Sequence, residues 1–307
     1  MSLVARVLNW LLRRFERRHL LHATPAQLRR GFETKSRLFA HMPRGSEVKT
    51  LTLTDGTARV PSLCITAPGA DARHTLLYFH GGAYVFGSPN THRGMLGQLS
   101  RLSGAQAILP DYRMAPEHPF PAALEDALIA WRVLLDSGIA PERMVMGGDS
   151  AGGGLVLALL GELIRTGAPL PAGVFAFSPL TDLTFSGDSY RHNDDREVML
   201  PGERATELAA LFLAGHDPED PRASPLFADF TGAPPVYLTV GDTEILLDDT
   251  RRIAARMRAQ GVDVSEEIGR DLPHVWPLMH IVLPEARATL RRVAHWIRRR
   301  PGWPAES

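Results

Sequence analysis

The chain has 307 residues, with 34 Lys and Arg against 34 Asp and Glu, and a single cysteine, Cys64. One cysteine excludes a disulfide-stapled fold and a cysteine-rich zinc site. A formal net charge of zero argues against a surface built throughout for nucleic acid, so no nucleic-acid partner is expected. No apolar run reaches the length of about 18 residues that a membrane-spanning helix requires.

The first predicted element is an amphipathic helix near the N-terminus. Its apolar face consists of Val4, Leu8, Leu11 and Phe15, and its polar face of Arg6, Arg13 and Arg17. The sequence leaves two partners for this apolar face: the protein's own core or active site, or a membrane surface or lipid substrate. The stretch lacks the unbroken apolar run and the cleavage site of a secretion signal, so we expect a cytoplasmic protein.

The next segments predict a mostly parallel sheet of the α/β class. Residues 48–54 and 60–66 form an antiparallel start around the Asp55-Gly56 turn. Continuous apolar runs then alternate with the helical stretches 121–138 and 151–167, which is typical of buried parallel strands covered by helices on both faces. The predicted buried strands are 75–79, 105–109, 144–146, 174–177 and 236–240, with a further strand over 262–268.

Residues 184–230 break this alternation. They are rich in acids, contain no clear strand and have one helical stretch, predicted at 204–214. An insertion after a strand at the carboxyl edge of such a sheet lies over the crevice where ligands bind. We therefore expect a cap made of residues 1–45 and 184–230, over a core made of residues 46–183 and 231–307.

A serine on a sharp turn is the first candidate for chemistry. The motif Gly148-Asp149-Ser150-Ala151-Gly152 follows a predicted strand and opens a predicted helix, which is the context of a nucleophile elbow. A glycine-rich helix start can also hold a phosphate, but neither of the common phosphate-loop patterns is present.

A serine nucleophile needs an imidazole to take its proton. The order nucleophile, acid, histidine favours a late histidine on a loop, and His274 follows the last predicted strand. His280 and His295 are predicted to be ordinary helix residues.

A second glycine-rich element, His80-Gly81-Gly82-Ala83-Tyr84, ends the predicted strand 75–79. Small residues let backbone N–H groups approach the oxyanion of a tetrahedral intermediate, and the N–H of Ala151 would add a further donor. The same residues could form a simple tight turn.

Four motifs in order resemble those of the hormone-sensitive-lipase-like (family IV) esterases of the α/β-hydrolase superfamily. They are HGGAYVFGS, DYRMAPEHPFPAALEDA, GDSAGGGLVLAL and PHVW, and the resemblance spans about residues 25–300. It implies that Ser150 is the nucleophile and His274 the base. It further implies an oxyanion hole formed by Gly81, Gly82, Ala83 and Ala151, with residues 112–117 supporting that loop.

Two positions depart from the family pattern. Ala83 stands where the family has a third glycine, and alanine resists positive φ. The family's acid is an Asp in D-P-L-x-D-E, and a gapless match of Glu244-Ile-Leu-Leu-Asp-Asp puts Glu244 at that position. Asp242 is the alternative acid, whereas Asp248 and Asp249 are expected in the first turn of a helix.

The resemblance implies a serine carboxylester hydrolase that cleaves short- to medium-chain acyl esters of hydrophobic alcohols through an acyl-enzyme, without a metal or cofactor. A lipase, a deacetylase or amidase, and a non-catalytic small-ligand receptor are the alternatives. The resemblance also leaves a homodimer of this chain open, because dimers are frequent among members of that family.

The charges are unevenly distributed. Residues 1–30 carry seven Arg against Glu16, a net +6, whereas residues 182–249 carry fifteen Asp and Glu against four Arg, a net −11. The two predicted cap pieces are therefore expected to attract each other across the mouth of the pocket.

Overall fold

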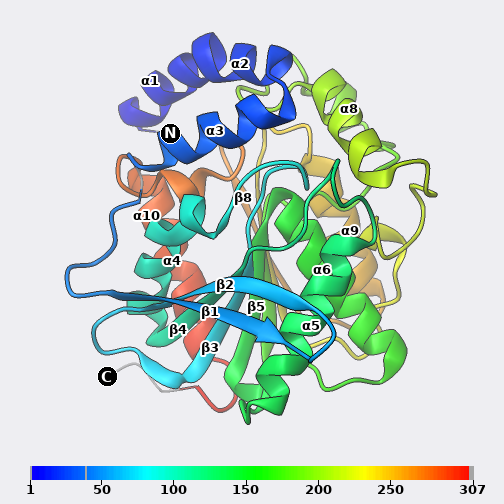
Figure 1. Cartoon of the computed structure of the whole chain (residues 1–307). Coiled ribbons are helices and arrows are strands. Elements are labelled where there is room, and N and C mark those ends of the chain that lie inside the picture. Colours follow the sequence, from blue (N-terminus) through cyan, green and yellow to red (C-terminus); the bar gives the residue numbers. More distant parts are fainter. Residues whose placement is uncertain (1, 39, 304–307) are drawn as a thin grey trace.

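A computed structural model of the chain describes residues 2–38 and 40–303. Eight strands form one sheet in the order β1-β2-β4-β3-β5-β6-β7-β8 (Figure 1). The β1/β2 pair is antiparallel and the pairs from β3 to β8 are parallel, as the sequence predicted. The structure adds an antiparallel pair between β2 and β4. The strands are β1 (Glu47–Thr54), β2 (Arg59–Thr66), β3 (Asp71–Phe79), β4 (Ala105–Pro110), β5 (Met144–Asp149), β6 (Gly173–Phe177), β7 (Val236–Gly241) and β8 (Val264–Gly269).

Helices cover both faces of the sheet, so its central strands are buried on both sides. One face packs against α4 (Pro89–Ser103) and α10 (Pro284–Arg298). The other packs against α5 (Ala122–Asp136), α6 (Ser150–Thr166) and α9 (Leu247–Ala259). Two short 3-10 helices complete the core, η2 (Pro141–Arg143) and η4 (Trp276–Met279). No helix within the described part of the chain is long and apolar enough to cross a membrane.

The N-terminal segment forms a helical layer at the top of the view in Figure 1. It contains α1 (Leu3–Leu11), a π-helical turn η1 (Leu12–Glu16), α2 (Arg17–His22) and α3 (Pro25–Ser36). Thr24 begins α3 with a reciprocal capping box to Gln27, which satisfies backbone groups at the helix start.

The predicted packing face of the first helix is wrong in part. The side that packs inward is formed by Ala5, Leu8 and Leu12, whereas Val4, Leu11 and Phe15 are exposed. A regular 3.6-residue period would keep Phe15 in line with Leu8, but Phe15 lies inside η1, whose wider turn rotates it out of that line. The small side chain of Ala5 also lets this side of the helix approach closely.

The inserted segment contains α7 (Ser189–His192), α8 (Gly202–Leu213) and η3 (Pro225–Phe227). It meets the N-terminal helices through arginines. Arg17 forms an ion pair with Asp194 at 3.1 Å, Arg13 donates to the Arg196 carbonyl, and Arg204 donates to the Ala23 carbonyl. The two segments are therefore joined by an ion pair and by hydrogen bonds to backbone oxygens, and their mutual attraction stays a prediction.

Candidate active site

Ser150 lies at the turn between β5 and α6, with φ at 52°. This left-handed conformation costs a non-glycine residue roughly 1–2 kcal/mol. The neighbouring glycines explain why the turn can form. A Cβ on Gly148 would come within 2.1 Å of the Gly152 carbonyl oxygen, and a Cβ on Gly152 within 2.1 Å of the Phe79 carbonyl oxygen. Only glycine fits at these two close approaches between backbones.

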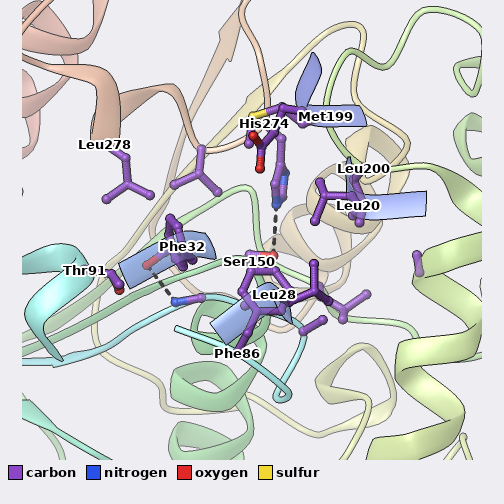
Figure 2. Close-up of a pocket in the computed structure, with 18 of the residues that line it drawn as sticks. Leu20, Leu28, Phe32, Phe86, Thr91, Ser150, Met199, Leu200, His274 and Leu278 are labelled. Carbon is purple, nitrogen blue, oxygen red and sulfur yellow. Dashed lines mark hydrogen bonds between the residues drawn. The ribbon is translucent and has the colours of Figure 1, made fainter. Parts of the chain in front are cut away.

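His274 lies on the loop between β8 and η4 and reaches Ser150. Its Nε2 is 2.9 Å from Ser150 Oγ, and its Nδ1 is 2.6 Å from Glu244 Oε2 (Figure 2 draws the serine contact). A carboxylate can only accept, so the Nδ1 proton donates to Glu244 and Nε2 is left to accept the serine proton. His280 directly follows η4 instead of lying in a helix, and His295 lies in α10 as predicted.

The carboxylate of Glu244 is buried and is held by three hydrogen-bond partners. Its Oε1 accepts the Gly241 N–H at 2.5 Å and the Ser178 hydroxyl at 2.8 Å, while its Oε2 meets His274. Asp242 instead accepts the Asp271 N–H at 2.7 Å and stabilises the neighbouring loop. Of the two acids left open by the sequence, the structure brings Glu244 to the histidine.

The environment of His274 changes its basicity. Burial by itself would lower the pKa of the imidazole, but the negative charge of Glu244 and its hydrogen bond outweigh burial and raise the pKa above the ordinary 6.5. The carboxylate therefore stabilises the imidazolium that forms when His274 takes a proton.

The glycine-rich loop after β3 lies beside Ser150, and Gly81, Gly82 and Ala83 all line the same cavity. The N–H of Gly81 donates to Asp149 Oδ1 at 3.1 Å. The sequence predicted Gly81 as an oxyanion donor, but its N–H is already bonded to Asp149 and is not a free donor. Gly82, Ala83 and the helix-start N–H of Ala151 remain.

Comparisons with known proteins place this arrangement in a family. The sequence profile of the alpha/beta hydrolase fold matches residues 76–278. An acetyl-hydrolase of Streptomyces hygroscopicus is 41% identical over 235 residues, which cover 76% of this chain and 79% of that protein. An esterase of Acinetobacter venetianus is 35% identical over 228 residues, which cover 74% and 75%.

Solved structures match over nearly the whole chain. The crystal structure of an esterase from the bacterial hormone-sensitive lipase (HSL) family has a TM-score of 0.92 and 39% identity, over 98% of this chain and 99% of that one. The chain belongs to the HSL family of alpha/beta hydrolases. A second match is the crystal structure of EstE5 soaked with p-nitrophenyl butyrate, with a TM-score of 0.91 and 39% identity over 97% and 98% of the two chains.

This HSL-family chain supports its glycine-rich loop with a buried polar cluster that the sequence did not reveal. Asp149 accepts the Tyr78 hydroxyl at 2.8 Å and lies 3.1 Å from His92 Nε2. Burial would raise the pKa of Asp149, but the charge of His92 and the hydrogen bonds from His92 and Tyr78 leave it lowered. The ionised carboxylate ties the nucleophile turn to the Gly81 N–H. Because Asp149 is the variable residue of G-x-S-x-G, the motif carries no signal for this role.

His80, the histidine of the glycine-rich loop, is packed in the protein interior and supports the loop. The His80 ring stacks on Tyr112 with centroids 4.4 Å apart, and the Tyr112 hydroxyl donates to the His80 carbonyl. Burial, followed by the charge of His92, lowers the pKa of His80 to about 3. His80 is therefore neutral near pH 7. Arg29 of α3 joins this support by donating to the Val85 and Ala115 carbonyls and to Glu117.

The cavity beside Ser150 has a volume of about 200 Å³ and an almost wholly apolar lining. Figure 2 shows apolar side chains around the Ser150 and His274 pair, among them Leu20, Leu28, Phe86, Met199, Leu200 and Leu278. Among residues 2–38 and 40–303, no group of three or more His, Cys, Asp or Glu side chains could hold a metal ion.

The sequence also did not predict a buried carboxyl group near the loop that carries Glu244. Glu197, from the inserted segment, accepts the Met199 N–H at 2.8 Å and the Ile245 N–H at 3.3 Å. Burial and the nearby charge of Glu244 raise its pKa. It joins the inserted segment to the loop that carries Glu244, and no local pattern marked it because its partners lie far along the chain.

The loop after β3 offers a matched pair of substitutions. Gly82→Ala is expected to reduce kcat for p-nitrophenyl butyrate by at least about 100-fold, because Gly82 has φ at 127° and a Cβ there would lie 2.0 Å from the Phe86 carbonyl oxygen. Ala83→Gly is the control. Ala83 already has φ at 53°, which glycine adopts more easily, so kcat should stay within a few-fold. Equal losses in both variants, measured alongside the thermal unfolding midpoint, would contradict this assignment.

Proposed function

We propose that this HSL-family chain is a serine carboxylester hydrolase in which Ser150 is the nucleophile, His274 the general base and Glu244 the acid. The observation that carries the proposal is the continuous hydrogen-bonded line from Ser150 through His274 to Glu244, at 2.9 and 2.6 Å, beside an apolar cavity. The names of the relatives, an acetyl-hydrolase and several esterases, support the same reaction.

The reaction follows from this geometry in two steps. His274 Nε2 takes the Ser150 proton while Oγ attacks the ester carbonyl, and the resulting oxyanion accepts N–H groups of Gly82, Ala83 and Ala151. The imidazolium then protonates the leaving alcohol, and an acyl group stays on Ser150. In the second step His274 takes a proton from water, the hydroxide oxygen attacks the acyl carbonyl, and the acid is released as the proton returns to Ser150.

We propose short- to medium-chain acyl esters of hydrophobic alcohols as the substrates. The cavity volume of about 200 Å³ is below the range of about 300 to 1,000 Å³ typical of pockets for drug-sized ligands, which favours a small acyl group. The apolar lining favours a hydrophobic partner over a charged one. The EstE5 crystals soaked with p-nitrophenyl butyrate support an ester of this size as the first probe.

Residues 1–45 and 184–230 together form the cap in this proposal, over a core of residues 46–183 and 231–307. Both segments contribute to the cavity lining, the first through Leu20, Leu28 and Phe32 and the second through Met199, Leu200 and Ala205. The Arg17–Asp194 ion pair between the two segments supports their action as one layer.

An acyl-chain series of p-nitrophenyl esters tests the substrate class. We expect kcat/KM to be greatest for the acetate to hexanoate esters and at least about tenfold lower for the laurate, because the small cavity cannot bury a long chain. Leu278→Ala, which enlarges the cavity, should shift the preference to longer chains, whereas Leu102→Ala, outside the cavity, should not. A flat profile up to palmitate would indicate a lipase instead.

Labelling separates catalysis from simple binding. A serine-directed organophosphonate should attach to Ser150, because only a serine whose proton is accepted by a base reacts with it. An unlabelled protein that still binds esters would indicate a receptor.

A further inference from the structure

The helical segment α1–η1 presents a continuous apolar surface to solvent. Leu3, Trp10 and Phe15 are 67%, 63% and 61% exposed. Val4, Val7 and Leu11 lie between them and are exposed as well. Within the described residues, six of the eleven large exposed hydrophobic side chains lie on this one segment. Single exposed apolar residues are ordinary, but a concentration of this kind marks an interaction surface.

The segment is anchored, so its apolar side is held outward. Ala5, Leu8 and Leu12 on the opposite side pack with residues of the core, and Leu8 and Leu12 line the catalytic cavity. The Asn9 amide donates to the Asp271 carbonyl at 2.9 Å, and the Ser2 N–H donates to Glu285 at 2.7 Å. This one short helical segment, drawn in blue in Figure 1, therefore lines the cavity with one side and exposes the other side to solvent.

The charges of the segment select the kind of partner. Together with the first two residues of α2, Arg17 and Arg18, the segment contains five arginines against the single acid Glu16. Arg6, Arg14 and Arg18 are exposed around the apolar surface, and Arg14 lies over the Phe15 ring at 5.6 Å. A second copy of the chain, packed face to face, would bring these arginines against one another, which is unfavourable. An apolar helix side with Trp and Phe, bordered by arginines, has the chemistry of an interfacial helix.

We propose that α1–η1 docks the protein on an anionic lipid bilayer, with Trp10 and Phe15 inserted at the level of the headgroups and Arg6, Arg14 and Arg18 against the lipid phosphates. Docking of this kind combines burial of apolar area with attraction to anionic lipid, and the second contribution is weakened by salt. The side of the helix that lines the cavity stays in place, so the docked protein holds its catalytic cavity next to the bilayer. The docking does not depend on the proposed esterase activity.

Co-sedimentation of the full chain with vesicles tests the proposal. The protein should bind vesicles of phosphatidylcholine and phosphatidylglycerol in equal parts at least about tenfold more tightly than pure phosphatidylcholine vesicles, and high salt should weaken that binding. The emission of Trp10 should shift to the blue on binding, because the other four tryptophans are already buried.

Matched variants locate the binding surface. The double variant W10S/F15S should bind anionic vesicles at least about tenfold more weakly, and R14Q/R18Q should lose most of the preference for anionic lipid. The control V48S/I268S removes two exposed apolar side chains from the edge strands β1 and β8 and should bind as the wild type does. Unchanged turnover of p-nitrophenyl butyrate in all three variants verifies their folding.

Three outcomes would overturn the proposal: no binding to either vesicle type, equal binding by W10S/F15S and the wild type, or equal loss in the control. Sedimentation velocity addresses the second copy. A stable wild-type dimer that W10S/F15S converts to a monomer, without vesicle binding, would assign the surface to an interface between two chains.

Discussion

Replacement of Ser150 by alanine is expected to reduce kcat for p-nitrophenyl butyrate by about 10⁶-fold, the size of loss seen when a serine protease loses its nucleophile. The hydroxyl is the atom that attacks the carbonyl, and in the structure it contacts His274 Nε2 at 2.9 Å. Alanine removes that atom alone and meets the same φ of 52°, so the fold should be retained. A steady-state assay and a thermal unfolding midpoint on the same preparation measure both effects.

Ser103→Ala is the matched control for this substitution. Ser103 is buried in α4, and its hydroxyl donates to the Leu99 carbonyl, away from the cavity. Its loss should change stability by about 1 kcal/mol and leave kcat unchanged. If the Ser150→Ala protein kept a tenth of the wild-type rate, or still reacted with the organophosphonate, the nucleophile would have to be another residue.

Replacement of Glu244 by alanine is expected to reduce kcat by about 10⁴-fold, because His274 loses the group that holds its tautomer and stabilises its charged form. Glu244→Asp should fall between that variant and the wild type. The Gly241 N–H and the Ser178 hydroxyl are placed to bond the carboxylate of a glutamate. An aspartate is one methylene shorter, so its carboxylate would reach these groups and His274 less well. Asp242→Ala should stay within about tenfold of the wild type, because Asp242 contacts the Asp271 N–H and not the histidine. A larger loss from Asp242→Ala than from Glu244→Ala would reverse the assignment.

The pH profile gives the Glu244 prediction a second measurement. Only neutral His274 accepts the serine proton, so kcat/KM should rise with pH through a midpoint above 6.5, since Glu244 raises the pKa of the imidazole. In Glu244→Gln the negative charge is absent, so the pKa falls and the rising limb should move to lower pH. A limb that moved in Asp242→Asn but stayed in place in Glu244→Gln would contradict the pairing.

Local patterns were sufficient for the features that depend on neighbouring residues. The alternation of apolar runs and helical stretches predicted the sheet and the helices on both its faces. This was possible because the hydrophobic periods of strands and helices can be read from short stretches of sequence. Gly148 and Gly152 predicted the turn at Ser150 for the same reason, since a tight turn needs small residues next to it. The family resemblance and the order of the motifs then singled out His274, whose role stays a prediction until it is measured.

Features that depend on distant partners were decided by the tertiary structure. Glu244 and Asp242 lie in one turn, and only the position of the loop after β8 determines which carboxylate meets His274. The use of the Gly81 N–H by Asp149 joins residues 68 positions apart, which no local pattern predicts.

The properties of the N-terminal helix also fall into these two groups. Its sequence alone determined that it is helical, amphipathic and basic, because periodicity and charge are properties of one segment. Which of its apolar side chains pack inward depends on tertiary contacts, such as the hydrogen bond from Asn9 to Asp271, 262 positions away. A hydrophobic pattern specifies an apolar surface, whereas burial of that surface depends on a complementary partner that only the folded chain brings to it.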